Sequence, residues 1–550
     1  MIYNSNNLDS QKTVDNPQTE EKATKPKLEK QTLVKKSPDL LEYETVQTRS
    51  GAIRGKLIDT AGFPHYQFLG IPYAKPPIGS LRFRHPKPVR PWTKILEADK
   101  KGPDCYPQKA DRTAAYSEDC LYLNIYTEDM NTTAKPVMVW IHGGWFTLGS
   151  GNQYAPLPGL LKEGVILVTI NYRLASLGFL TFGNDVVSGN MGLKDQALAI
   201  QWVKQNIRSF GGNPNKITIL GESAGGVSVH AHVLSPWNFG QIHGAVAHGG
   251  TMLLYNHIKS YGDREEIIAK HVAKELGCDE DLDQRTLDCM QSMDVEDIMN
   301  TLKNEITGGL NNKLVYEWRP VIDNYASNPF LPLDPLEAMQ TGVFNKIPFM
   351  SGTVKNDGAI IMPTFALTGK TTKEVKEKWG SLGPALMYSS PNHKATVEDG
   401  LLANITMKYY NHPEGDSAVE QDQPVLDILS DSVFISPDQK TVQLMSKHSQ
   451  HIFNYYLTQQ TDKSFLRKIL KLDLVYLLEK YGQKLEFSEE EFALSKHMIK
   501  YWTNFAKFGH PTPSVSDDLP HWDAVTEESH VGNVLDNHLS YKYYARIILS

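Results

Sequence analysis

Long hydrophobic runs are absent from the sequence. No segment approaches the roughly 18 consecutive apolar residues that a membrane-spanning helix requires, although 40% of the 550 residues are hydrophobic and 10% are aromatic. This composition is typical of a globular protein with a sizeable core. The sequence therefore predicts a soluble chain without a membrane span, whose length fits one large α/β domain with insertions.

An excess of positive charge is also absent. The chain carries 56 Lys and Arg residues against 63 Asp and Glu residues, a formal net charge of −7, and its isoelectric point is about 6.2. No basic stripe interleaved with aromatic residues reverses this balance. These features argue against a nucleic-acid-binding surface. Small molecules or other proteins are therefore the expected partners.

Motifs for cofactors and metals are missing as well. Neither a G-x-G-x-x-G fingerprint nor a P-loop occurs, which argues against a nucleotide cofactor. No cluster of His, Asp, Glu or Cys has the spacing of metal ligands. We therefore expect neither a cofactor nor a bound metal.

Cysteine is scarce, with four residues in the chain. They form two locally spaced couples, Cys105 with Cys120 and Cys278 with Cys289. Four cysteines allow three connectivities, and pairing within each couple closes the shortest loops. Four separate buried thiols are the alternative, because disulfides belong to oxidising compartments.

Hydrophobic periodicity is absent from residues 1–40, which are polar and rich in Lys, Glu and Pro. We predict a disordered tail there and one folded domain over residues 41–550. The tail has no apolar stretch typical of a secretory signal. Two interpretations stay open: a signal has been removed, or the protein is cytoplasmic. Sequons at Asn131 and Asn404 are compatible with a glycosylated, secreted or cell-surface protein.

Strand and helix patterns alternate from residue 136 onward. Strands are predicted by the β-branched runs in the segments 136–144, 164–173, 217–226, 345–353 and 451–457. Helical periods lie between them and near the end, where 488–509 opens with a capping box, Ser488 to Glu491. This order predicts a mostly parallel sheet with helices on both faces. Ligands of such sheets bind at the carboxyl ends of the strands.

The segment G-E-S-A-G, residues 221–225, fits the pattern G-x-S-x-G. Its small flanking residues let the chain turn sharply from a strand into a helix and hold the serine hydroxyl above the sheet. A predicted strand precedes it, so we interpret Ser223 as a nucleophile on such an elbow. The segment HGGWFTLG, 142–149, also follows a strand. Its glycines suit it to present backbone N–H groups to an oxyanion.

Five ordered motifs resemble those of the carboxylesterase and cholinesterase family of α/β hydrolases. They are YQFLGIPYAKPPIGSLRF (66–83), EDCLYLN (118–124), WIHGG (140–144), NYRLASLGFL (171–180) and FGGNPNKITILGESAGG (210–226). The resemblance extends from about residue 42 to the C-terminus. It implies an α/β-hydrolase fold, with a large, mostly parallel sheet flanked by helices and a deep gorge leading to the serine. It also implies two disulfides and two ion pairs, namely Cys105–Cys120, Cys278–Cys289, Arg82–Glu118 and Arg173–Asp195.

The resemblance assigns the oxyanion donors to Gly144, Trp145 and Ala224. The second of these positions is normally Gly or Ala in similar enzymes. The indole of Trp145 is therefore expected to crowd, and even block, the place where the acyl group lies. The alternative is that the ring turns away and shapes specificity.

The resemblance also places the acid of a catalytic triad at Asp357, but no histidine stands where the triad needs its base. In the segment 465–482 the alignment puts Leu470 at the histidine position. A leucine cannot accept the proton, and loss of the histidine costs about a millionfold in turnover in a measured triad. His448 and His451 flank a predicted strand and are the candidates for a displaced base. Glu222, beside the nucleophile, is expected to tune the gorge electrostatics and to be a poor replacement base.

Two functions follow from these patterns. The first is a non-catalytic family member that keeps the elbow and acts by binding a protein partner, as in cell adhesion, or a ligand such as a small hydrophobic ester. The second is an active serine hydrolase of carboxylic esters that uses a displaced histidine. The predicted elbow is common to both, and the missing base favours the first.

Overall fold

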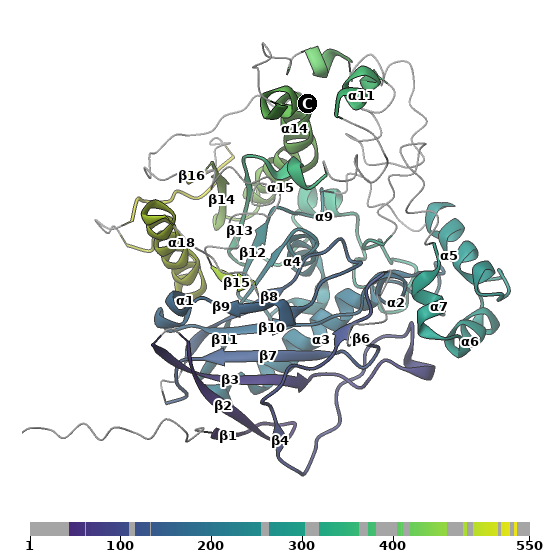
Figure 1. Ribbon diagram of the computed structural model, residues 1–550, viewed down its shortest axis with the longest axis horizontal. Helices are drawn as coiled ribbons and strands as arrows, with labels where there is room; N and C mark the ends of the chain where they lie inside the picture. The colour runs from purple at the N-terminus through teal and green to yellow at the C-terminus, as the bar shows by residue number, and fades with distance from the viewer. Residues whose placement is uncertain are drawn as a thin grey trace, which may run out of the picture. The chain divides into compact units, whose positions relative to one another are not determined.

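A twelve-stranded sheet forms the centre of the computed structural model (Figure 1). The structure describes residues 43–60, 62–108, 116–131, 134–254, 263–302, 318–361, 372–380, 404–408, 410, 418–458, 477–480, 488–514, 519–527 and 533–535. The predicted tail, residues 1–40, lies outside them. Residues 41–550 form one unit.

The strands of the large sheet follow the order β1-β2-β3-β7-β10-β8-β11-β12-β13-β14-β16, with β4 beside β2. Their bounds are β1 Tyr43–Gln47, β2 Ala52–Thr60, β3 Phe63–Pro72, β4 Leu96–Glu97, β7 Tyr122–Thr127, β8 Lys135–Ile141, β10 Ile166–Ile170, β11 Gly212–Glu222, β12 Gly244–His248, β13 Phe349–Val354, β14 Ile452–Leu457 and β16 Asn533–Leu535. Two small sheets pair β5 (Asp104–Cys105) with β6 (Tyr116–Ser117) and β9 (Tyr154–Pro156) with β15 (Leu478–Lys480).

The sheet is parallel from β10 through β8 to β16, as the alternation of strands and helices predicts. Strands β1, β2, β3 and β7 pair antiparallel, as do β7 and β10. The sequence patterns did not predict this antiparallel edge. The α/β fold is confirmed, and the parallel half of the sheet carries the G-x-S-x-G motif.

The described helices flank this sheet. They are α1 Pro158–Lys162, α2 Ala175–Phe179, α3 Met191–Asn206, α4 Ala224–Leu234, α5 Asp263–Glu275, α6 Gln284–Ser292, α7 Val295–Asn300, α9 Pro335–Thr341, α11 Thr372–Glu377, α14 Ala418–Leu429, α15 Ser436–Ser446 and α18 Glu489–Phe508. Short 3-10 turns include η3 Ile207–Phe210 and η5 Asp357–Ile360, and a π-helical turn, η6, spans Ser430–Ile435.

Two hydrophobic layers cover the two faces of the sheet. Successive side chains of a strand point to opposite faces. In β8 the side chains of Val137, Val139 and Ile141 join the layer that contains α3 and α4, whereas Met138 and Trp140 join the layer that contains α1 and α18. Every residue of β8 is buried, as expected of a central strand with helices on both sides.

The predicted ends of the last helix are confirmed. The Ser488 hydroxyl accepts a hydrogen bond from the Glu491 N–H at 3.2 Å, and the Glu491 carboxylate accepts one from the Ser488 N–H at 2.8 Å. Gly509 follows α18 with a φ of 72°, a left-handed conformation in which glycine carries no steric penalty. These caps satisfy backbone groups that a helix end leaves without partners.

The covalent and ionic links that the resemblance implied are present. The disulfides are Cys105–Cys120 and Cys278–Cys289, so none of the four cysteines is a free thiol. The guanidinium of Arg82 pairs with Glu118 at 2.6 Å, and that of Arg173 with Asp195 at 2.7 Å.

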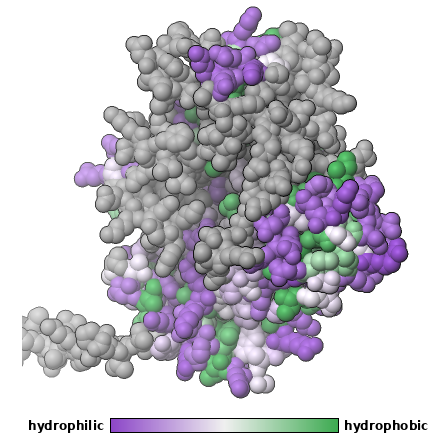
Figure 2. All heavy atoms as spheres, turned by 45° about the vertical axis from the view of Figure 1, so that its right-hand side comes forward, coloured by the Kyte–Doolittle hydropathy of each residue, from purple (hydrophilic) through white to green (hydrophobic). Residues whose placement is uncertain are grey.

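On the face shown in Figure 2, hydrophobic residues of the described surface are scattered among hydrophilic ones. None of the described helices combines the length and the apolar composition needed to span a bilayer.

Candidate active site

Ser223 occupies a sharp turn between a strand and a helix, as predicted. β11 ends at Glu222 and α4 begins at Ala224, so Ser223 is the one residue between them. Its backbone has φ 58° and ψ −121°, a conformation that side-chain-bearing residues rarely adopt and that costs about 1–3 kcal/mol. Such strain persists only where the surrounding structure fixes it.

Glycines allow the chain to pack tightly around this turn. A Cβ on Gly225 would lie 2.1 Å from the Ile141 carbonyl oxygen, and one on Gly250 would lie 2.4 Å from the Ser223 carbonyl oxygen. Both atoms that would be met belong to the backbone, which cannot yield as a flexible side chain can. A 2.9 Å hydrogen bond from the Ser223 N–H to the His248 carbonyl fixes the turn to β12. The elbow is thus held by β8 and β12, the two strands that flank β11.

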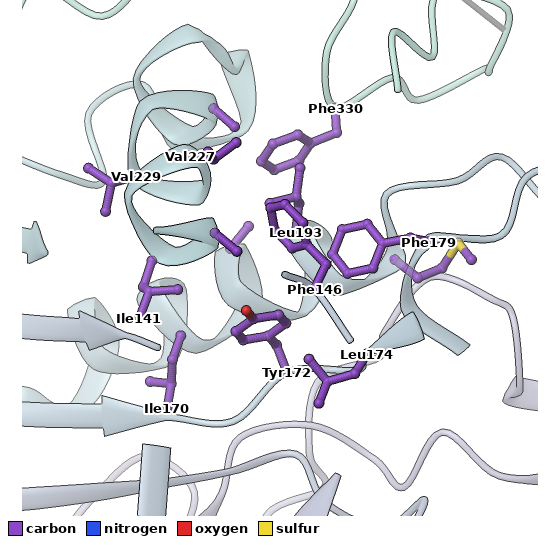
Figure 3. Packing of buried hydrophobic residues seen from close by; sticks show 14 of the residues in the cluster. Ile141, Phe146, Ile170, Tyr172, Leu174, Phe179, Leu193, Val227, Val229 and Phe330 are labelled. Atoms are coloured by element: carbon purple, nitrogen blue, oxygen red, sulfur yellow. The ribbon is translucent and has the colours of Figure 1, made fainter. Parts of the chain in front are cut away.

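The loop 142–149, at the end of β8, is also strained. Gly144, Trp145 and Phe146 have φ values of 114°, 58° and 59°. The Phe146 side chain is fully buried, with its ring centroid 4.7 Å from that of Phe179 (Figure 3). Its carbonyl accepts a hydrogen bond from the Ala175 N–H at 2.7 Å. Burial of this ring therefore anchors the loop against the core.

Two backbone N–H groups near Ser223 have no hydrogen-bond acceptor among the described residues. A Cβ built on Gly143 would lie 3.2 Å from the Ser223 Cβ, so the loop approaches the elbow directly. Within the part of the chain that the structure describes, neither the Gly144 N–H nor the Ala224 N–H has a hydrogen-bond acceptor. The Ala224 N–H also points out of the positive end of the α4 dipole. An oxyanion formed at Ser223 would find donors here.

Trp145 is half-buried, and its side chain packs against the main hydrophobic layer. The left-handed φ of 58° is costly for a bulky aromatic residue. The expectation that its indole crowds the acyl position stays a prediction.

Asp357, like Ser223, lies just beyond the carboxyl ends of the parallel strands. In the register of the sheet, Glu222 pairs with His248 and His248 with Gly352, and Asp357 follows β13 five residues after Gly352. The Asp357 side chain is buried, and one carboxylate oxygen accepts a hydrogen bond from the Val354 N–H at 3.0 Å. The carboxyl ends of β8, β11 and β13 therefore bring the loop 142–149, Ser223 and the predicted acid, Asp357, to the same side of the sheet, where these strands end.

Gly358, next to Asp357, allows the acid loop to contact a helix backbone. A Cβ there would lie 2.5 Å from the Ser430 backbone nitrogen. The Gly358 N–H donates a 3.0 Å hydrogen bond to the Ser430 hydroxyl in the π-helical turn η6. This contact fixes the loop that presents Asp357.

Glu222 lies between the loop of β8 and β9. Its carboxylate oxygen is 3.0 Å from the place of a Gly143 Cβ. Burial, and to a smaller degree the Glu222 carboxylate, raises the pKa of Tyr154 on β9. The expectation that Glu222 tunes the electrostatics of the gorge stays a prediction.

Neither His448 nor His451 lies near Ser223. The His448 ring donates a 3.0 Å hydrogen bond to the Gln340 carbonyl at the end of α9. His451 comes just before β14, four residues before Tyr455, which is level with Glu222 across the sheet. At about 3.3 Å per residue, His451 lies about 13 Å toward the amino ends of the strands. Leu470 lies outside the described residues.

The sequence reasoning missed His248, which lies directly beneath the elbow. The Trp502 indole N–H donates to its Nε2 at 3.1 Å, and the Tyr455 hydroxyl contacts its Nδ1 at 2.8 Å. Because an indole N–H only donates, a neutral His248 carries its proton on Nδ1. Both ring nitrogens are therefore engaged, and His248 supports the elbow without being available as a base for Ser223.

Comparisons with known proteins agree with this geometry. The family model described as the carboxylesterase family matches residues 42–543. The chain is 34% identical to the pyrethroid hydrolase Ces2e of Rattus norvegicus, with 88% of this chain and 84% of the relative covered. It is 35% identical to a carboxylic ester hydrolase of Bombus ignitus, with 76% and 75% covered. It is 32% identical to the cocaine esterase of Homo sapiens, with 88% and 86% covered.

Replacement of Gly143 should separate the oxyanion loop from the elbow. In Gly143→Ala the new methyl group would lie 2.5 Å from the Glu222 carbonyl oxygen, so the loop must move. We expect the rate at which Ser223 reacts with a fluorophosphonate to fall about 10²-fold, the typical loss for one oxyanion donor. Gly159→Ala, on α1, is the control, because its methyl group would meet only the end of the Ile499 side chain. Equal rates for Gly143→Ala and the unchanged protein would show that the loop 142–149 does not supply oxyanion donors to Ser223.

Proposed function

The chain belongs to the carboxylesterase family, and we propose from this that it is a serine hydrolase of small carboxylic esters. The observation that carries the proposal is the strained conformation of Ser223 beside the N–H groups of Gly144 and Ala224. Strained backbone of this kind clusters at functional sites, where it forms part of the mechanism. The three relatives named above are each called hydrolases or esterases.

The proposed reaction has two steps. The Ser223 hydroxyl attacks the ester carbonyl, and the resulting oxyanion accepts hydrogen bonds from the N–H groups of Gly144, Trp145 and Ala224. Collapse of this intermediate releases the alcohol and leaves an acyl group on Ser223, which water then removes. Asp357 orients the group that accepts the serine proton and stabilises its positive charge. None of the described histidines that we considered as a base occupies this place.

A non-catalytic role in binding is the second candidate, and the alignment of Leu470 with the histidine position favours it. In that case the elbow and the loop would be parts of the fold without a catalytic role, and the protein would bind a ligand or a protein partner. The two candidates differ in one measurable property, the reactivity of Ser223.

Labelling by a fluorophosphonate distinguishes the two candidates. A hydrolase should take up one label per chain, detected as a mass increase of the intact protein. Ser223→Ala should take up none, because only an activated serine attacks the phosphorus rapidly. Turnover of a short p-nitrophenyl ester should fall at least about 10⁴-fold in the same variant.

Circular dichroism serves as the control, because a loss of labelling is informative only if Ser223→Ala remains folded. A folded, unchanged protein that neither labels nor turns over ester would contradict the proposed hydrolase. That result would instead support the non-catalytic candidate.

We further propose that Trp145 limits the size of the acyl group. Trp145→Gly removes the indole and suits the left-handed φ of 58°. The ratio of kcat/KM for p-nitrophenyl hexanoate over acetate should rise at least roughly tenfold, which is the gain from even one methylene that the enlarged pocket newly accommodates. Trp145→Phe keeps a ring at this position and should leave the ratio near its original value. An unchanged ratio in Trp145→Gly would show that the indole lies away from the acyl group.

We also propose that the protein is secreted or resides on the cell surface. Its four cysteines form two disulfides, which persist in oxidising compartments. Both sequon asparagines are exposed: Asn131 lies between β7 and β8, and Asn404 lies in a helical segment. Exposure meets the first requirement for N-glycosylation at these positions.

Glycosidase treatment tests this location. In protein secreted from eukaryotic cells, N-glycosidase treatment should increase electrophoretic mobility. The increase should be smaller in Asn131→Gln and in Asn404→Gln, and absent in the double variant. Asn215→Gln, an exposed asparagine outside any sequon, is the control. If the protein has the same electrophoretic mobility before and after N-glycosidase treatment, neither asparagine is glycosylated.

A further inference from the structure

Three polar side chains meet behind the loop of Asp357. Ser351 and Asn454 are register partners on the adjacent strands β13 and β14. Asp438 lies in the first turn of α15, which packs on both strands. All three side chains are buried. A carboxyl group is therefore enclosed close to the proposed catalytic acid.

The hydrogen bonds of Asp438 are incomplete. The Asn454 side-chain amide donates to Asp438 Oδ2 at 2.6 Å and to the Ser351 carbonyl at 3.0 Å. Asp438 Oδ1 is buried and has no hydrogen-bond partner among the described residues. Burial of an ionised carboxylate with an unpaired oxygen costs far more free energy than burial of the same group in its neutral, protonated form. Burial, with a smaller contribution from the Asp357 charge, raises the pKa of Asp438 to about 7, against the opposing effects of Ser351 and Asn454.

One continuous helical segment connects Asp438 to the acid loop. The residues that join α14, η6 and α15 all have right-handed helical backbone angles, so the chain does not break between them. The segment accepts the hydrogen bond from Gly358 at Ser430 and carries Asp438 eight residues later. A π-helical turn such as η6 is frequent at functional sites. The segment therefore fixes Asp438 relative to Asp357.

Few other charges belong to the elements that pack against Asp438. In the part of the chain that is described, these elements contribute Asp357 in η5, Asp431 in η6, Glu337 on α9 and Lys440 on α15 itself. Asp431 is engaged by the Tyr410 hydroxyl at 2.5 Å. Of this group, Asp357 is the one whose charge acts on Asp438.

We propose that Asp438 is a second carboxyl group of the acid site, which holds a proton at neutral pH and sets the charge around Asp357. It is a positioning residue, because it acts on the reaction only through Asp357, and this role rests on the proposed hydrolase function. When Asp438 is neutral, Asp357 carries the sole negative charge of the pair. As the pH rises, the Asp438 proton passes to solvent and a second negative charge appears behind Asp357. That charge favours the protonated form of any base that pairs with Asp357.

The pH dependence of unfolding tests the proton on Asp438 without any assay of activity. The folded state binds this proton up to about pH 7, whereas the unfolded state releases it near its ordinary pKa of 3.8. The group therefore lowers stability as the pH rises through this window. Asp438→Asn keeps the shape and an oxygen that accepts from Asn454, but it cannot ionise. The Tm of the variant minus that of the unchanged protein should grow between about pH 5 and 7 and level off above about pH 8.

Asp427→Asn is the matched control, since Asp427 lies on the same helical segment and its carboxylate accepts a 2.8 Å hydrogen bond from the Gln423 side chain. Its Tm difference should stay constant over the same range. An equally constant difference for Asp438→Asn would overturn the proposal.

The rate at which a fluorophosphonate labels Ser223 tests the link to the reaction. In the unchanged protein and in Asp427→Asn, the pH profile should contain an ionisation near neutral pH that disappears in Asp438→Asn. Identical profiles for all three proteins would overturn the positioning role. Absence of labelling at every pH would refute the hydrolase function and this role, while the unfolding data would still decide the proton on Asp438.

Discussion

The strained backbone of Ser223 is the constraint on which the rest of the site depends. A residue with φ 58° and ψ −121° remains in that conformation only if its neighbours prevent relaxation. Here the neighbours are backbone atoms of β8 and β12, at contacts where Gly225 and Gly250 leave no room for a side chain. The turn is therefore a property of the whole parallel half of the sheet.

The same constraint explains the surroundings of the elbow. His248, whose carbonyl accepts the Ser223 N–H, is itself held by Tyr455 and Trp502. On the other face, burial of Phe146 holds the loop of β8 against the core, and a Cβ built on Gly143 of this loop would lie 3.2 Å from the Ser223 Cβ. Both hydrophobic layers of the protein thus contribute to the position of Ser223.

Local signals in the sequence predicted the parts of the fold that short segments determine. The G-E-S-A-G segment, the capping box at Ser488 and the central strands fall into this class. The antiparallel edge, β1 to β7, depends on pairings that no local period encodes. His248 was missed because its partner Trp502 is 254 residues away, and Asp438 because its environment comes from β13, β14 and η5. His448 and His451 were considered as bases from their proximity to a predicted strand, but they lie near its amino end.

The most direct test of the elbow and oxyanion site is a crystal structure of the protein after reaction with a fluorophosphonate. The phosphoryl oxygen of the adduct stands in for the oxyanion of ester hydrolysis. We expect this oxygen to lie about 2.7–3.1 Å from the backbone nitrogens of Gly144 and Ala224, with Ser223 still at a positive φ. A phosphoryl oxygen that contacts neither nitrogen, or a Ser223 backbone relaxed to ordinary angles, would show that the elbow and the loop do not form an oxyanion site.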